Sequence, residues 1–347
     1  MLYQTENRHG GDIYGGIALD FSANVSPLGT PRSVTEAIER ALPELYRYPD
    51  PYCRTLVQTI SEYEGVPKNF VLCGNGASEL IYAYCEAVRP KRAMELAPTF
   101  SEYSLALRRT GCEVVRFALK QEENFDLRKD FLPFLAREKI DALFLCNPNN
   151  PTGTYVPIGE LEAFADTLPE DVLLVMDEAY MEFATEPDCC SMVDYIKAHP
   201  EKSILVLRTF SKYYAMAGLR VGYALGSEEL IGILRKCSAS WNLNVCAQKA
   251  AVAGLADQEY YQEQKAKIVE GREYLEKEMA ALGCRVYPSQ SNFIYFDTGK
   301  DPAWIQEQLM EKGIRIGAFE MSRVSVGTME ECKLYIKALK EILEAAE

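Results

Sequence analysis

The sequence contains only two histidines and no two cysteines separated by two residues. These absences exclude the common ligand spacings of a structural zinc site, and we expect no metal. The cysteines number eleven, which is odd, and most lie in apolar stretches, as reduced cysteines do. The adjacent Cys189 and Cys190 are an exception, and the sequence leaves their role open.

Long apolar stretches and an excess of basic residues are also absent. No uninterrupted apolar run reaches the length of a membrane span, and the formal net charge is −14. An acidic protein is a poor partner for nucleic acid or an anionic membrane surface, so we expect neither. Residues Met1–Gly10 are polar and contain no apolar core of a signal peptide. These features predict a cytoplasmic protein.

A chain of 347 residues, of which 48% are hydrophobic, has room for one large domain and a smaller one. Short apolar segments bounded by Gly, Pro, Asn or charge alternate with helical patterns such as Ser78–Ala87 and Ile158–Ala165. These segments are Phe70–Cys73, Ala93–Leu96, Glu113–Phe117, Ala142–Cys146, Leu173–Asp177, Ile204–Arg208 and Val221–Ala224. The alternation predicts an α/β fold with a mostly parallel seven-stranded sheet covered by helices.

The pattern changes after about Gly226, where we expect a smaller α+β domain. Its predicted elements are a long charged helix at Tyr260–Leu282, strands at Asn292–Phe296 and Val324–Val326, and helices at Pro302–Lys312 and Met329–Glu344. The predicted division is an N-terminal arm over residues 1–35 that packs with the small domain, a large domain over 36–255 and the small domain over 256–347.

Two segments rich in turn-forming residues follow predicted strands. Gly74–Glu79 also directly precedes a helix, so its small residues and the N–H groups of the helix start could bind a phosphate. A plain tight turn is the alternative. Asn147–Gly153 contains two X-Pro steps, which make a rigid turn. This turn either presents an Asn amide at a fixed angle or simply closes a surface loop.

Two further segments place charged groups after predicted strands. Asp177 ends an apolar run, and a buried carboxylate there needs a cation, either in a structural ion pair or from a cofactor. Thr209, Ser211 and Arg220 bracket Lys212, and two hydroxyls with a guanidinium suit a phosphate dianion. A partly desolvated lysine beside them can form a Schiff base, whereas a lone lysine would be a surface charge.

Together and in this order, the four segments resemble the fold-type I enzymes of the class I and II aminotransferase group, over essentially the whole chain. The resemblance implies pyridoxal 5′-phosphate (PLP) as cofactor. Lys212 would bind PLP covalently and act as general base, and Asp177 would pair with the pyridinium nitrogen. Tyr180 and Asn150 would hydrogen-bond the ring hydroxyl, and Phe100 would stack on the ring. The residues that would hold the cofactor's phosphate are Gly76, Ala77, Ser78, Thr209, Ser211 and Arg220.

The same resemblance implies residues for the substrate and for a second subunit. Arg323 is similar to the arginine that binds the substrate's carboxylate or phosphate. Asn24 and His9, in the arm, resemble residues on the substrate side, although His9 could equally tie down the arm. Tyr48 resembles a tyrosine that reaches the phosphate from the neighbouring subunit, so we expect a homodimer with shared active sites.

Two subgroups of the family compete. Histidinol-phosphate aminotransferases share the patterns at Ser211–Lys212, Gly218–Arg220 and Arg323–Thr328. L-threonine-O-3-phosphate decarboxylases of cobalamin biosynthesis share more of the N-terminal half, at His9–Ile13 and Asp20–Asn24, together with Trp241–Asn244. We expect an aminotransferase that acts on a small-molecule amino acid or amino-acid phosphate, with the decarboxylase as the alternative. A PLP-binding regulatory module is a distant third, because no DNA-binding domain or basic patch accompanies the motifs.

One departure from both subgroups concerns recognition of the substrate's phosphate. Both usually carry an arginine near Ile314–Gly317, where this chain has Gly317. Residues i and i+2 of a strand share a face, so Arg315 could replace the missing arginine. If Arg315 does not, a generic amino-acid aminotransferase becomes plausible.

Overall fold

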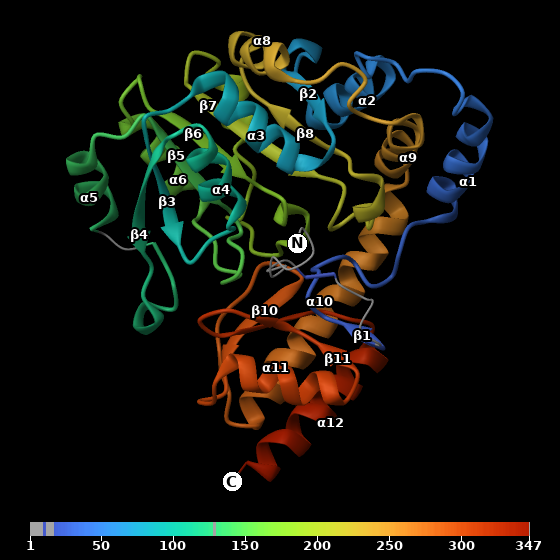
Figure 1. Cartoon of the computed structure of the whole chain (residues 1–347), viewed down its shortest axis with the longest axis vertical. Helices are drawn as coiled ribbons and strands as arrows, with labels where there is room; N and C mark the ends of the chain where they lie inside the picture. Colours follow the sequence, from blue (N-terminus) through green and yellow to red (C-terminus); the bar gives the residue numbers. More distant parts are fainter. Residues whose placement is uncertain (1–9, 12–16, 128–129, 347) are drawn as a thin grey trace, which may run out of the picture.

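A computed structural model describes residues 10–11, 17–127 and 130–346 of the chain. Figure 1 shows a large part built around one sheet, and a smaller part formed by the C-terminal residues together with the described N-terminal arm. The long helix α10 (Gln258–Ala281) leads from the first part into the second. No helix within the described residues is both long and apolar enough to cross a membrane.

The large sheet has the strand order β2-β8-β7-β6-β5-β3-β4 and is parallel except for β8. Its strands are β2 (Val71–Gly74), β3 (Arg92–Ala97), β4 (Glu113–Ala118), β5 (Ala142–Cys146), β6 (Leu173–Asp177), β7 (Ile204–Thr209) and β8 (Gly222–Leu225). The predicted seven-stranded, mostly parallel sheet is therefore confirmed. Because β2, β3, β5, β6 and β7 point the same way, their carboxyl ends meet at one edge.

Apolar side chains on both faces of this sheet form two layers under helices. Along β5, Leu143 and Leu145 belong to one buried cluster, and Ala142 and Phe144 belong to the other. This alternation follows from the two-residue period of a strand. The second cluster includes residues of α3 (Gly76–Val88), α4 (Glu102–Arg109) and α8 (Glu228–Cys237). The first cluster includes residues of α2 (Arg54–Glu64), α5 (Phe131–Glu138), α6 (Ile158–Thr167), α7 (Val193–Ala198) and α9 (Val245–Ala256). Helix α1 (Arg32–Ala41) packs against α9.

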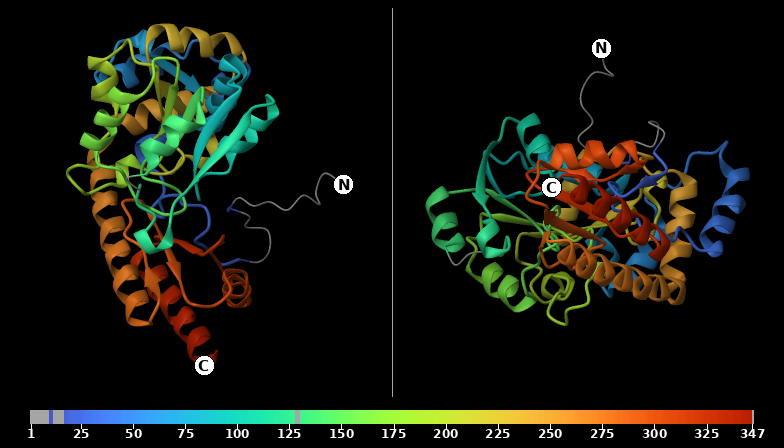
Figure 2. Two further views of the ribbon diagram at one scale, coloured as in Figure 1. Left: turned by 90° about the vertical axis from the view of Figure 1, so that its left-hand side faces the viewer. Right: turned by 90° about the horizontal axis from the view of Figure 1, so that it is seen from below.

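The smaller part contains an antiparallel sheet in the order β12-β13-β10-β9. Its strands are β9 (Arg285–Val286), β10 (Phe293–Asp297), β12 (Gly317–Ala318) and β13 (Ser322–Ser325). Helix α11 (Pro302–Glu311) packs against β12 and β13 of this sheet, and α12 (Met329–Ala345) packs against α10 and α11 (Figure 2). The short strand β1 (Leu19–Asp20) of the arm pairs in parallel with β11 (Ile314–Arg315).

A capping box fixes the start of α12 and thereby the end of the segment that carries Arg323. The hydroxyl of Thr328 accepts from the backbone N–H of Glu331, and the Glu331 carboxylate accepts from the N–H of Thr328. This reciprocal pair satisfies two backbone donors that a helix start otherwise leaves unpaired.

Gly222, the first residue of β8, marks the closest approach of the sheet to the start of α3. A Cβ at this position would lie 2.7 Å from the backbone nitrogen of Ala77 and 2.8 Å from the carbonyl oxygen of Arg208.

Both of these neighbours of Gly222 are backbone atoms, so we expect Gly222→Ala to lower the free energy of unfolding by about 1–3 kcal/mol, measured by urea unfolding. The control is Gly232→Ala in α8, where a Cβ meets nothing within 4 Å and should stabilise by about 0.5–1 kcal/mol. Equal urea midpoints for the two variants would contradict this prediction.

Candidate active site

A cavity of about 1020 Å³ lies at the carboxyl ends of β5, β6 and β7, where the smaller part and the arm cover the sheet edge. Ligands bind at this edge in open α/β sheets. The predicted site residues that line the cavity are Asn24, Ala77, Ser78, Phe100, Asn150, Asp177, Tyr180, Thr209, Ser211, Lys212, Arg220 and Arg323. The structure thus brings together residues that are up to about three hundred positions apart in the sequence.

The start of α3 and the segment after β7 form one polar wall of the cavity. The hydroxyl of Thr209 donates to Ser211 Oγ over 3.0 Å and accepts from the backbone N–H of Ser211. Arg220 Nη1 lies 3.4 Å from Ser211 Oγ. Gly76 has φ +78°, a backbone conformation that favours glycine, and a Cβ there would lie 2.6 Å from Arg220 Nη2, so a larger residue would make this guanidinium shift. Two hydroxyls, a guanidinium and the N–H groups of a thirteen-residue helix make a site suited to a phosphate.

Lys212 lies next to this wall with its amine inside the cavity. Its Nζ donates to the carbonyl oxygen of Ala23, in the arm, over 2.8 Å. Burial, followed by the nearby guanidinium groups of Arg323 and Arg220, lowers the pKa of Lys212 to about 8, and Asp177 opposes this shift. About a tenth of the amine is therefore neutral, and so nucleophilic, at pH 7, far more than for an exposed lysine.

Asp177 ends β6 and is buried with both carboxylate oxygens bonded. Oδ2 accepts from the hydroxyl of Tyr103 over 2.6 Å, and Oδ1 accepts from the backbone N–H of Ala179 over 3.0 Å. Burial raises the pKa of Asp177, whereas these two hydrogen bonds and the charge of Lys212 lower it. The carboxylate is held in one orientation and faces a cavity that contains a lysine.

Tyr103 is a residue of the site that the sequence does not mark. It lies in α4, three residues after Phe100, and its ring packs edge-to-face on Phe100 with centroids 5.6 Å apart. In the sequence it looks like any aromatic residue on the buried side of a helix. The spacing from Phe100 was a usable signal, but nothing local indicates that its hydroxyl reaches Asp177.

Amide and hydroxyl groups line the opposite side of the cavity. The Nδ2 atoms of Asn24 and Asn150 lie 3.3 Å and 3.5 Å from the hydroxyl of Tyr180. Arg323 donates from Nη1 to Asn150 Oδ1, and from Nη2 to the carbonyl oxygen of Ser22 over 2.7 Å. The Arg323 guanidinium also lies over two rings, with 5.4 Å to the centroid of Phe293 and 4.9 Å to that of Phe319.

One predicted residue lies away from the cavity, and another falls outside the described part of the chain. Tyr48 is 82% exposed and packs on Trp241, with ring centroids 4.9 Å apart, rather than lining the cavity. His9 lies outside the described residues.

Contrary to what the sequence had suggested, Arg315 and Gly317 do not belong to a single strand. Arg315 belongs to β11, which pairs with β1 of the arm, and Gly317 belongs to β12, which pairs with β13. Ile316 separates the two sheets. Both Arg315 and Gly317 nevertheless line the cavity. A Cβ at Gly317 would lie 2.7 Å from the ring of Phe319, so the glycine makes room for this ring over Arg323.

Comparison with known proteins identifies the family. The model of aminotransferase class I and II matches residues 17–339. This chain belongs to that family. It is 33% identical over 333 residues to the histidinol-phosphate aminotransferase of Moorella thermoacetica, and the aligned residues cover 94% of this chain and 85% of the relative. Membership confirms the predicted resemblance and identifies the chain as a transferase.

Solved structures give the same fold. The histidinol-phosphate aminotransferase of Sinorhizobium meliloti, in complex with pyridoxal-5′-phosphate, has a TM-score of 0.89 at 28% identity and covers 95% of this chain and 92% of its own. The L-threonine-O-3-phosphate decarboxylase of Porphyromonas gingivalis has a TM-score of 0.83 at 25% identity, and the match covers 94% of this chain and 99% of the decarboxylase chain. Both subgroups named from the sequence therefore occur among the structural relatives.

Tyr103→Phe tests the support of Asp177. Removing the hydroxyl takes a donor from a buried carboxylate, which costs about 1.5–3 kcal/mol when the carboxylate is ionised. It also raises the pKa of Asp177 further above the unfolded value of about 3.9. When the pKa of a carboxyl group is higher in the folded than in the unfolded state, the free energy of unfolding falls as pH rises from the unfolded pKa through the folded one. The destabilisation by Tyr103→Phe should therefore be larger at pH 8 than at pH 5. Urea unfolding of the cofactor-free protein at both pH values measures this difference.

Tyr84→Phe is the matched control. Tyr84 is fully buried in the same apolar cluster, but within the described residues its hydroxyl has no hydrogen-bond partner. Its removal should be neutral or stabilising at both pH values. A loss for Tyr103→Phe no larger than that for Tyr84→Phe would show that the contact with Asp177 contributes nothing.

Proposed function

We propose that this chain is a PLP-dependent aminotransferase of the histidinol-phosphate type, which binds its cofactor at Lys212. The observation that carries the proposal is the convergence of Asp177, at the end of β6, and Lys212, just after the neighbouring parallel strand β7, at one cavity with a phosphate-type wall. The similarity to histidinol-phosphate aminotransferases over 93–94% of the chain supports the substrate class.

The chain's residues fit PLP. The wall formed by Thr209, Ser211, Arg220 and the start of α3 suits the cofactor's phosphate, and a side chain at Gly76 would fill the place of Arg220. Asp177 would hold a proton at the pyridine nitrogen, because a buried carboxylate favours the protonated ring. Asn150 and Tyr180 would bind the ring hydroxyl.

When bound, PLP supplies an electron sink for the bonding pair left at the substrate's Cα. Lys212 would bind the cofactor covalently until the substrate amine replaces it, and its neutral amine would then take the Cα proton and return it elsewhere. Its pKa of about 8 suits a group that must exchange a proton near neutral pH. Arg323 and Asn24 would bind the substrate's anionic group, and Phe100 would cover the ring and exclude water.

We further propose that the protein acts as a homodimer and that the division at residues 35 and 255 separates the arm, the large domain and the small domain. Leu42, Leu45, Tyr46, Tyr48 and Tyr52 are all strongly exposed and lie within eleven residues of one another in the sequence. So many large apolar side chains in one segment are typical of a surface that another subunit covers. Tyr48 of one subunit would then reach the phosphate site of its partner.

The reaction itself is the direct test. With histidinol phosphate and 2-oxoglutarate, the protein reconstituted with PLP should form glutamate, and Lys212→Ala should reduce the turnover number by at least about a thousandfold. Borohydride reduction should fix PLP to the peptide that contains Lys212. Capture of PLP by the cofactor-free protein should accelerate as pH rises through about 8, because only the neutral amine attacks.

Other outcomes separate the alternatives. Release of carbon dioxide from O-phosphothreonine without any amino transfer would establish the decarboxylase, which the arm's Asp20–Asn24 segment favours. Binding of amino acids without turnover would indicate a regulatory module. Labelling of another lysine would contradict the assignment of Lys212.

Mixed dimers test the role of Tyr48. Tyr48→Phe removes a hydrogen bond to a charged group, which should weaken PLP binding by about ten- to a hundredfold. If Tyr48 acts across the interface, mixing and refolding Tyr48→Phe with Lys212→Ala should give hybrid dimers with one intact site each, about a quarter of all sites. No recovery of activity in the mixture would show that Tyr48 does not act on the partner.

A further inference from the structure

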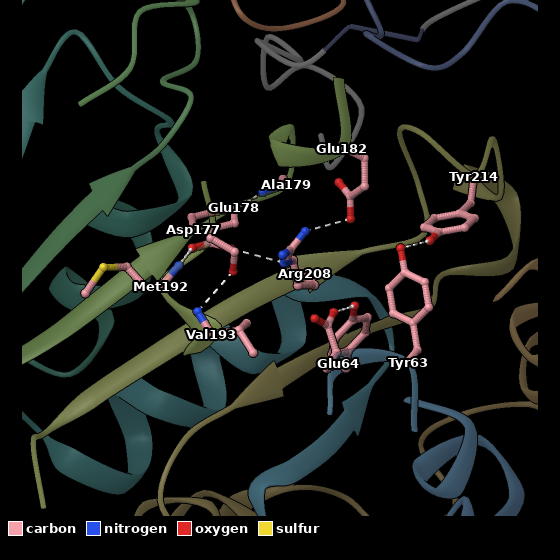
Figure 3. A network of polar contacts seen from close by, with 12 residues as sticks. Tyr63, Glu64, Asp177, Glu178, Ala179, Glu182, Met192, Val193, Arg208 and Tyr214 are labelled. Carbon is pink, nitrogen blue, oxygen red and sulfur yellow. Dashed lines mark hydrogen bonds and ion pairs between the residues drawn. The ribbon is translucent and has the colours of Figure 1, made fainter. Parts of the chain in front are cut away.

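A buried charged network lies directly behind the segment that follows Asp177 (Figure 3). Arg208, in β7, pairs through Nε with Glu178 Oε2 at 3.1 Å and through Nη1 with Glu182 Oε1 at 2.9 Å. The exposed fractions of these side chains are 8%, 0% and 10%. Long charged side chains are seldom this buried, so the burial of all three calls for a structural or functional explanation.

Glu178 connects this network to two other segments. Its Oε2 accepts from the hydroxyl of Ser191 over 2.6 Å, and its Oε1 accepts from the backbone N–H of Met192, just before α7, over 2.8 Å. The backbone N–H of Glu178 donates to the carbonyl oxygen of Leu207 in β7. The residue next to Asp177 is therefore held on its side chain and on its backbone.

The two carboxylates bracket the segment that lines the cavity. Between Glu178 and Glu182 lie Ala179, whose N–H binds Asp177 Oδ1, and Tyr180, whose hydroxyl lies beside Asn24. Both carboxylates reach the same guanidinium, so residues 178–182 are fastened at both ends to one point on β7.

Arg208 also belongs to β7, the strand that leads into the segment with Thr209, Ser211 and Lys212. Arg208 is followed by Thr209, which lines the cavity, and Lys212 comes four residues later. Because neighbouring residues of a strand face opposite sides, Arg208 lies behind the strand while Thr209 faces the cavity. One guanidinium therefore joins the segment of Asp177 and Tyr180 to the segment of Thr209, Ser211 and Lys212.

Stability alone does not account for this arrangement. Burial raises the pKa of both Glu178 and Glu182, which shows the cost of keeping two carboxylates in the interior. Buried ion pairs can often be replaced by apolar side chains of similar size with no loss of stability or with a gain. The guanidinium offers what apolar packing does not: a hydrogen bond from Nη1 to Glu182 and an ion pair from Nε to Glu178, which together set the distance between two segments.

We propose that Arg208, Glu178 and Glu182 form a positioning cluster that sets Asp177 and Tyr180 against Lys212, and that the geometry of the cofactor site depends on it more than the stability of the fold does. This inference rests on the proposed function, because the relative position of the Asp177 and Lys212 side chains matters only if both contact one bound cofactor.

The first variant is Arg208→Met, which leaves two buried carboxylates without their cation. We expect the unfolding midpoint of the cofactor-free protein to fall by roughly 5–10 °C. Amide hydrogen exchange of the peptide covering residues 178–192 should become about tenfold faster or more. The control is Arg116→Met at the remote strand β4, where Arg116 pairs at 2.8 Å with the buried Glu95. It should lower the midpoint without changing exchange in residues 178–192.

The second variant separates position from stability. Glu178→Gln, Glu182→Met and Arg208→Met together remove every charge of the cluster, and Gln keeps an amide oxygen for the Met192 N–H. We expect the unfolding midpoint to return to within about 3 °C of the wild type. PLP affinity should nevertheless stay about tenfold or more below the wild type, and the pH dependence of the bound cofactor's absorbance should be shifted. If Arg208→Met does not fold, this triple variant carries the test by itself.

The result that would overturn the proposal is a triple variant with wild-type exchange in residues 178–192, wild-type PLP affinity and a wild-type absorbance profile. Such a result would show that packing alone sets the site. Failure of the proposed function looks different, because the wild-type protein would then bind no PLP at Lys212. The exchange measurement, which needs no cofactor, would still report on the cluster.

Discussion

Asp177 and Lys212 are two ionisable groups buried at the same edge of the large sheet, and each is costly there without compensation. The carboxylate is stabilised by Tyr103 from α4 and by the backbone of Ala179, and the amine by the carbonyl oxygen of Ala23 from the arm. The partners thus come from three separate parts of the chain. Compensation of two charges in a low-dielectric interior thus adds to the apolar packing of α4 and to the pairing of β1 with β11, which hold α4 and the arm in place.

The order of the strands in the large sheet determines which site residues lie next to one another. Strands β5, β6 and β7 are parallel neighbours, so the segments after them deliver Asn150, Asp177 and Lys212 side by side. The smaller part closes the cavity from the other side with Arg323, which is bound to Asn150 and to the carbonyl oxygen of Ser22. A ligand between them would touch both parts of the molecule, which fixes its orientation and removes water.

Much of this could be predicted from the sequence, because the signals are local. All seven strands of the large sheet and the three helices predicted after Gly226 lie within about two residues of their predicted bounds, since short apolar runs and turn residues mark them. Helices α8 and α9, which also follow Gly226, are not predicted from the sequence. Lys212, Asp177 and Arg323, which the structure places at one cavity, each stand in a segment that the sequence marks by its motif.

What was missed depends on contacts between distant residues. The carbonyl oxygens of Ser22 and Ala23 carry no sequence signature, and Tyr103 looks like any buried aromatic residue. The pairing of Arg208 with Glu178 joins positions thirty residues apart, and only the register of β6 on β7 places them together. The placement of Arg315 and Gly317 on one strand failed because a single residue, Ile316, lets the chain pass between two sheets.

The charges of the cavity bear on which substrate the proposed enzyme prefers. The protein carries a net charge of −14, yet the described residues that line the cavity include four cations, Lys212, Arg220, Arg315 and Arg323, against the two carboxylates Glu102 and Asp177. A locally positive, partly enclosed cavity in an acidic protein concentrates anions there and repels them elsewhere. Asp177 would be offset by the cofactor's protonated ring, and Arg220 by the cofactor's phosphate. Arg323 then remains on the substrate's side, where Asn150 and the carbonyl oxygen of Ser22 hold its guanidinium in place. We expect this charge to select a substrate with an anionic group, either a carboxylate or a phosphate, because both accept charge-assisted hydrogen bonds from a guanidinium.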